Sequence, residues 1–172
     1  MNKKKIFKIV VPIAIVLAVV LIWFLKDAES KQPALVADDD SDFALHAAGP
    51  IDLEQLKSYG LPIIIDFGAD ACAPCKEMAP VLEELNRDLR GRAIIKFVDV
   101  WKNPEYAQGY RVSAIPTQFF FDANGKPFDP QSPIGLRLYR YANEEGEHIL
   151  TAHVGGMTKE QILSVLEEMG ME

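Results

Sequence analysis

Short apolar runs and longer amphipathic segments follow one another along most of the chain. Four of the runs are rich in β-branched and aromatic residues, as in strands buried in a sheet. These runs are residues 63–67, 93–100, 118–122 and 148–154. Three other segments repeat apolar residues at helical spacing, which predicts amphipathic helices. These segments are residues 50–59, 73–90 and 158–169.

Local signals indicate how these elements begin and how the strands pair. Thr158 and Gln161 form a capping box at the start of the last helix, and Asn103-Pro104 predicts a further short helix through Gln108. Strand–helix–strand units imply parallel pairing, whereas the hairpin signal Asn124-Gly125 implies an antiparallel pair. The predicted fold is therefore α/β, with a mixed sheet flanked by helices.

The segment Lys126–Gly146 is longer than a simple hairpin connection. It contains three prolines and then the run Leu136-Arg137-Leu138-Tyr139, before the last predicted strand. We interpret it as an elaborated hairpin. Two roles stay open for it: a surface loop without a function of its own, or a loop that binds a partner.

The first 26 residues differ in character from the rest. A lysine-rich start precedes seventeen residues without a charge, Ile9–Leu25, and with Ile6 the apolar segment is long enough to cross a bilayer. This pattern predicts an N-terminal signal-anchor transmembrane helix at 1–26, a polar linker at 27–43 and a folded domain at 44–172. A cleaved signal peptide and a buried core helix are the alternatives.

The charge distribution predicts which side of the membrane the domain occupies. Lysines precede the apolar segment and an acidic stretch follows it, so the positive-inside rule places the N-terminus in the cytoplasm and the domain outside the cell membrane. Residues 33–172 carry twelve Lys and Arg against 23 Asp and Glu, a formal charge of −11. Such an acidic domain repels phosphate backbones, which disfavours nucleic-acid binding.

The only two cysteines of the chain, Cys72 and Cys75, lie where the strand at 63–67 passes into the helix at 73–90. A thiol in the first helical turn lies near unpaired backbone N–H groups and the positive end of the helix dipole. Both favour the thiolate, so the spacing indicates thiol–disulfide exchange. The alternatives are a zinc site, which needs further ligands, a structural disulfide, which stabilises little across so short a loop, and two unrelated buried thiols.

Several motifs occur in the order found in thioredoxins. They are Ile65-Asp66-Phe67, Cys72-Ala73-Pro74-Cys75, Pro80 inside the helix, Lys96, Ile115-Pro116-Thr117 and Gly155-Gly156. From about residue 44 to 170 the chain therefore resembles the thioredoxin family, whose fold is a mixed sheet flanked by helices. Together with the predicted anchor, the whole chain resembles the membrane-anchored extracytoplasmic members of bacteria.

The resemblance implies roles for the matching residues. Cys72 would be the exposed nucleophile and Cys75 would resolve the mixed disulfide, so that the two form the redox-active disulfide. Asp66 would assist proton removal from Cys75, and burial in an apolar strand should raise the pKa of its carboxyl. A satisfied polar core residue is the alternative for Asp66. Lys96 would pair with Asp66 or lie in solvent on its strand.

The resemblance also implies a substrate-binding loop. Pro116 is expected to be cis, which would turn the backbone of Ile115 toward an extended substrate peptide. An ordinary trans proline at a strand start is the alternative. Ala73 and Pro74, between the cysteines, are further expected substrate contacts.

The chain departs from the family beside the cysteine motif. The family often has tryptophans there, whereas this chain has Gly68 and Ala71, which predicts a more open floor around Cys72. Asp70 adds a negative charge near Cys72, which should oppose thiolate formation.

We predict a thiol–disulfide oxidoreductase that reduces protein disulfides through Cys72-Ala-Pro-Cys75 and uses no metal or other cofactor. The resemblance implies an integral-membrane electron donor of the CcdA/DsbD type. The reductive direction follows from the Ala-Pro dipeptide and from Ile115 before the proline. The alternatives are a disulfide-forming oxidase or isomerase, an apocytochrome c thiol reductase, and a redox-inactive module that binds a partner through Lys126–Gly146.

Overall fold

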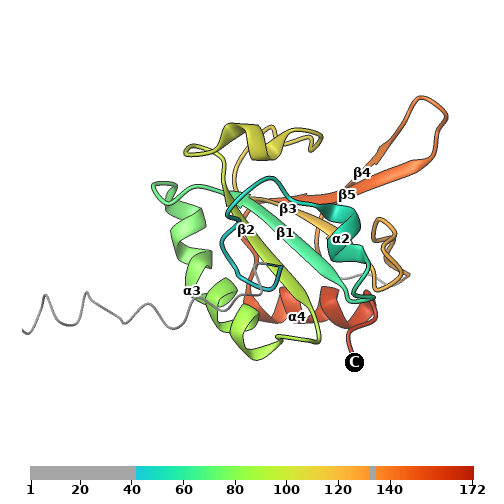
Figure 1. Cartoon of the computed structure of the whole chain (residues 1–172), viewed down its shortest axis with the longest axis horizontal. Coiled ribbons are helices and arrows are strands. Elements are labelled where there is room, and N and C mark those ends of the chain that lie inside the picture. The colour runs from blue at the N-terminus through green and yellow to red at the C-terminus, as the bar shows by residue number, and fades with distance from the viewer. Residues whose placement is uncertain (1–41, 132–134) are drawn as a thin grey trace, which may run out of the picture. The chain divides into compact units, whose positions relative to one another are not determined.

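The computed structural model describes residues 42–131 and 135–172. In this part the chain forms one five-stranded sheet between layers of helix (Figure 1). The elements in chain order are α2 (Leu53–Lys57), β1 (Ile63–Gly68), α3 (Ala73–Asp88), β2 (Ile94–Asp99), the 3₁₀ helix η1 (Pro104–Ala107), β3 (Thr117–Phe121), β4 (Leu138–Ala142), β5 (His148–Val154) and α4 (Lys159–Glu168).

The predicted anchor at 1–26, and the predicted linker up to residue 41, lie outside the described residues. In the part of the chain that the structure does describe, no helix combines the length and the apolar character needed to cross a bilayer.

The sheet is mixed, as predicted. Its strand order is β2-β1-β3-β5-β4. β1 runs parallel to β2 and antiparallel to β3, and the other pairs are antiparallel. β1 therefore lies between two partners, and all six of its residues are buried. This explains its continuous apolar run, since a strand covered on both faces needs no polar alternation.

The two faces of the sheet carry separate apolar cores. On one face Ile64 and Phe120 pack with the apolar stripes of α3 and α4. On the other face Ile65 and Phe119 pack with Leu56 of α2 and with residues around η1. β1 and β3 thus send alternate side chains to the two cores, as the two-residue period of a strand requires.

The structure adds a strand, β4, that the sequence pattern did not predict. Asn124-Gly125 does reverse the chain, with the Gly125 N–H donating to the Asp122 carbonyl at 2.8 Å. The returning segment makes one bridge, between Phe121 and Pro127, and β3 pairs antiparallel with β5, the next strand that the sequence predicted. Proline cannot donate to a ladder, so the segment does not continue as a strand.

β4 pairs with β5 at the outer edge of the sheet and forms a hairpin that projects beyond the other strands (Figure 1). Its turn is closed by the Gly146 N–H, which donates to the Asn143 carbonyl at 3.1 Å. β4 carries Arg140 between two tyrosines and has no buried residue. An exposed edge strand lacks the apolar run that marked the others, which is why the pattern did not reveal it.

Candidate active site

Cys72 and Cys75 lie at the start of α3 and are joined by a disulfide. Cys72 is the N-cap of α3, and its sulfur accepts the backbone N–H of Cys75 at 3.4 Å. Pro74 occupies the first turn, where its missing N–H costs no helical hydrogen bond. Cys72 is 7% exposed and Cys75 3% exposed. Cys72 was expected to be exposed, but in the disulfide form it is nearly buried. Ala73 beside it is exposed.

A second loop faces the disulfide. The Ile115–Pro116 peptide bond is cis, as predicted. Ile115 packs against the cluster formed by Ala69, Cys72 and Cys75. The loop is fixed at both ends, because the Thr117 hydroxyl donates to the Ala114 carbonyl at 2.7 Å and the Gly155 N–H donates to the Pro116 carbonyl at 2.9 Å.

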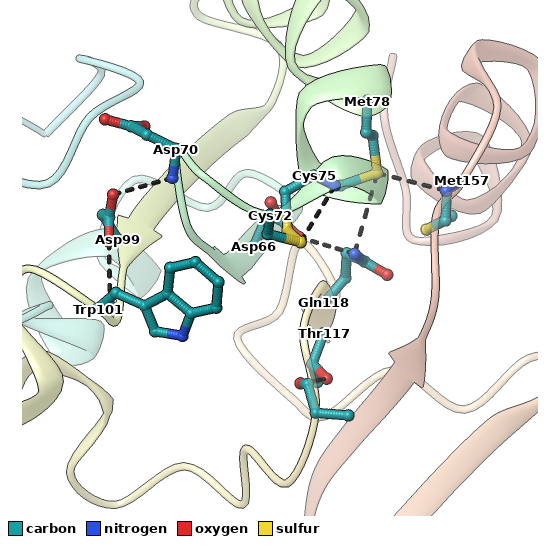
Figure 2. Close-up of a disulfide and its surroundings, with 11 residues drawn as sticks. Asp66, Asp70, Cys72, Cys75, Met78, Asp99, Trp101, Thr117, Gln118 and Met157 are labelled. Atoms are coloured by element: carbon teal, nitrogen blue, oxygen red, sulfur yellow. Dashed lines mark hydrogen bonds between the residues drawn. A yellow bond between two sulfur atoms is a disulfide. The ribbon is translucent and has the colours of Figure 1, made fainter.

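Asp66 lies in the middle of β1 and is fully buried. Burial raises the pKa of its carboxyl to about 7, and a hydrogen bond from Gln118 acts in the opposite direction. The Gln118 Nε2 donates to the Asp66 Oδ1 at 2.7 Å (Figure 2). Gln118 was not among the site residues expected from the sequence. The available signal was a long polar side chain directly before the three phenylalanines of β3.

Neither predicted role of Lys96 agrees with the structure. Lys96 pairs in register with Ile65, so it shares the sheet face of Ile65, and Phe97 is the residue beside Asp66. Lys96 therefore lies on the face opposite Asp66. It is also not in solvent, since it is 4% exposed and its Nζ donates to the Ala44 carbonyl. The roles failed because adjacent strand residues point to opposite faces.

Gly68 ends β1 directly beside the disulfide. A Cβ atom on Gly68 would stand 2.7 Å from the Phe97 Cε2 and 3.2 Å from the Cys75 Sγ. The aromatic ring of Phe97 thus occupies the space that a side chain at 68 would need. Beyond the ring, Phe97, Cys75 and Leu82 line a pocket of about 260 Å³. The glycine therefore does not leave the open space beside Cys72 that the sequence predicted, because Phe97 fills it; the pocket lies beside Cys75 instead.

Charged residues form a corner beside Cys72 (Figure 2). Asp70 pairs with Lys102, which partly neutralises the negative charge expected to oppose the thiolate. Asp99 accepts the backbone N–H groups of Asp70, Trp101 and Lys102, each at 3.0 Å. Burial alone would raise the pKa of Asp99, but these hydrogen bonds lower it. Asp99 therefore ties the loop before the cysteines to the loop after β2.

Trp101 extends from this corner on the side of the disulfide (Figure 2). It is 62% exposed, although in the sequence it lies well after the cysteine motif. The pairing of Gly68 with Asp99 explains its position, because it brings the loop after β2 next to the loop before Cys72. In the residues described here, no cluster of three or more His, Cys, Asp or Glu side chains is arranged to hold a metal ion.

Comparisons with known proteins agree with this geometry. The family model of thioredoxin matches residues 53–137. The thioredoxin of Rickettsia bellii (strain RML369-C) is 37% identical to this chain over 83 residues, which cover 48% of this chain and 76% of the relative. The chain belongs to the thioredoxin family. It is accordingly a thiol–disulfide oxidoreductase of the thioredoxin type.

Other relatives are similar over shorter stretches or at lower identity. A thioredoxin of Staphylococcus aureus is 48% identical over 66 residues, which cover 38% of this chain and 62% of the relative. A crystal structure of chloroplastic thioredoxin z superimposes with a TM-score of 0.48 at 23% identity, covering 73% of this chain and 93% of that chain. Thioredoxins act on protein disulfides, which defines the general class of substrate.

The buried carboxyl of Asp66 should make stability depend on pH. Its pKa of about 7 in the folded chain exceeds the ordinary value of 3.8, so folding favours the protonated form. This contribution is complete below about pH 4 and is lost as the pH rises through 7. The Asp66→Asn variant, which cannot ionise, should therefore gain stability relative to the natural chain as the pH rises, by up to about 4 kcal/mol.

Urea unfolding of the disulfide forms across this pH range measures the effect. Glu77→Gln is the matched control, because Glu77 lies on α3 and faces solvent. A stability difference between Asp66→Asn and the natural chain that did not change with pH would contradict the assignment.

Proposed function

We propose that this chain reduces disulfide bonds of protein substrates with the dithiol of Cys72 and Cys75. The observation that carries the proposal is the position of the two sulfurs at the N-terminus of α3, against Ile115 of the cis-proline loop. There the Cys75 N–H and the positive end of the helix dipole favour a thiolate at Cys72. Cys72 is accordingly the nucleophile.

The reaction consists of two exchange steps. The Cys72 thiolate attacks one sulfur of the substrate disulfide, which forms a mixed disulfide and expels the other sulfur as a thiolate. Cys75 then loses its proton and attacks the Cys72 sulfur, so that the second substrate thiolate leaves and the Cys72–Cys75 disulfide forms. Two electrons pass to the substrate. Asp66 is the acceptor of the Cys75 proton.

The surface around the disulfide suits a polypeptide substrate. Ala73 and Pro74 are exposed between the cysteines, and Ile115 is half-buried next to them. An extended peptide can pair with the backbone at Ile115, which precedes the cis bond, and then lies across Ala73 and Pro74. Trp101 offers an exposed indole at the border of this surface.

Serine variants test the order of the two steps. Cys72→Ser should abolish turnover, because the thiolate that attacks the substrate is gone and the remaining Cys75 is buried. Cys75→Ser should form a mixed disulfide with a protein substrate such as insulin and then stop, since nothing resolves it. Non-reducing electrophoresis of the full-length chain measures the trapped species.

A Cys75→Ser chain that still turned over would refute the resolving role of Cys75. The Cys72→Ala/Cys75→Ala double variant serves as the control. If it restored function to cells that lack the protein, a redox-inactive binding module would be favoured. The hairpin of β4 and β5, with the exposed Tyr139, is the surface available for that second function.

Redox potential decides the direction of electron flow. A reductant should have a value near that of thioredoxin, about −270 mV, whereas a strong disulfide-forming oxidase lies near about −120 mV. We expect the former, since the Ala-Pro dipeptide and Ile115 resemble those of reducing members. Equilibration of the full-length chain in detergent against thiol buffers measures the potential. A value near that of the oxidase would overturn the reductive direction, and leave the exchange chemistry intact.

The compartment is the third element of the proposal. The charge-free segment Ile9–Leu25 and the lysines before it support a membrane anchor with the thioredoxin domain outside the cytoplasm. A reductant in an oxidising compartment needs a supply of electrons across the membrane. We assign this supply to an integral-membrane carrier of the CcdA/DsbD type. A disulfide of apocytochrome c, reduced to its thiols, is one narrower substrate.

A fusion to alkaline phosphatase tests the compartment, because that enzyme is active only after export to an oxidising environment. The full-length chain carrying the phosphatase at its C-terminus should be active and remain with the membrane fraction. The same fusion without residues 1–26 is the control and should be inactive. An inactive full-length fusion would contradict the extracytoplasmic assignment.

A further inference from the structure

β3 places the amide of Gln118 directly opposite the carboxyl of Asp66. The two residues pair in register across β1 and β3, and both are fully buried. Their side chains lie on the same face of the sheet and meet beneath the start of α3 (Figure 2). The Gln118 Nε2 also lies 3.9 Å from the Met78 Sδ, and this sulfur in turn accepts the Met157 N–H at 3.3 Å. The amide is therefore held from two sides.

The two oxygens of the Asp66 carboxyl have different surroundings. Oδ1 accepts the Gln118 amide at 2.7 Å, whereas Oδ2 has no hydrogen-bond partner among the described residues. Oδ2 lies close to the disulfide, because the position of a Cβ on Gly68 is 3.5 Å from Oδ2 and 3.2 Å from the Cys75 Sγ. Asp66 Oδ2 and Cys75 Sγ therefore both lie within 3.5 Å of the position that a Cβ on Gly68 would take.

We propose that Gln118 is a positioning residue for the resolving step: it binds Oδ1 of Asp66 and thereby presents Oδ2 to Cys75 as the proton acceptor. This inference rests on the proposed function and adds a residue to it. The Gln118 Nε2 faces Oδ1 and donates to it, which is the contact that stabilises the ionised carboxylate. An apolar side chain at 118 would leave both oxygens without a donor.

The other groups around Asp66 do not supply this function. β2 presents Phe97 on the same face, and the segment before α4 presents Met157. The titratable groups that α3 directs toward this space are the two cysteines. The side chains of His46, Asp70, Lys76 and Glu83 line the pocket beside Cys75 and Phe97, and none of them has a hydrogen bond to Asp66 among the described residues. Gln118 is thus the polar partner that the structure gives to Asp66.

In the resolving step one proton passes from Cys75 to Asp66 and then to solvent. In the mixed disulfide, the Cys75 thiol transfers its proton to Asp66 Oδ2, and the Cys75 sulfur then bonds to the Cys72 sulfur. The bond between Cys72 and the substrate breaks, and the substrate sulfur leaves with the electron pair as a thiolate. Asp66 later releases the proton to solvent. The Gln118 amide exchanges no proton and stabilises the ionised carboxylate that accepts one.

Substitution of Gln118 by methionine tests the inference, because methionine keeps the size and removes the donor. Without the hydrogen bond the Asp66 carboxylate is less stable, so a higher pH is needed before it accepts the Cys75 proton. We expect the pH midpoint of the resolving step to rise by about one unit or more, which is about tenfold in rate below the midpoint. The attack by Cys72 should keep its natural rate.

Dithiobis(nitrobenzoic acid) separates the two steps in a stopped-flow experiment on the reduced full-length chain. Attack by Cys72 releases one thionitrobenzoate, and attack by Cys75 on the mixed disulfide releases the second. The rate of the second release is measured against pH. If the midpoint of Gln118→Met equals that of the natural chain, the inference is overturned. If the natural chain releases only one equivalent, the proposed function itself fails.

A double-mutant cycle excludes a purely structural effect. In the Asp66→Asn background, Gln118→Met should not move the pH profile further, because the titrating group is gone. An equal shift in that background would mean that Gln118 acts through packing, and would overturn the inference. Should the methionine variant not fold, Gln118→Glu keeps the size. Its carboxyl opposite Asp66 should raise the midpoint in the same way, and an unchanged midpoint would be contrary.

Discussion

The pairing of β1 with both of its neighbours is the constraint on which the rest of the site depends. Its register with β2 sets Gly68 beside Asp99, and its register with β3 sets Asp66 beside Gln118. A shift of either register by one residue would turn these side chains to the opposite face of the sheet. The continuous burial of β1 prevents such a shift, because any other register would expose part of an apolar run.

A carboxyl buried at this position works against stability. Removal of Asp66 from water disfavours its charged form, and the surrounding strands supply no salt bridge on its face of the sheet, where Phe97 is the neighbour. The hydrogen bond from Gln118 offsets part of that cost. Natural proteins retain such locally unfavourable groups at functional sites, and the carboxyl here lies beside the resolving Cys75.

The electrostatics around the two sulfurs are local and opposed. The helix N-terminus favours a thiolate at Cys72, while Asp70 disfavours one. Lys102 pairs with Asp70, and Asp99 fixes the backbone of both loops. Since Asp70 and Lys102 are largely exposed, their charges are screened by solvent and salt. The main contribution of these residues is therefore to fix the orientation of the two loops, and the charge of Asp70 contributes less.

Local signals in the sequence were sufficient for the elements that carry them: the apolar run of β1, the cysteine pair at the start of α3, the capping box at Thr158 and the proline that proved to be cis. The tertiary structure alone decided which side chain lies beside Asp66. A sequence shows the period of a strand but not its register, and register placed Phe97 and Gln118 there and turned Lys96 to the other face. The tertiary structure also determined that β4 exists, because an exposed edge strand buries too little apolar surface to leave a pattern in the sequence.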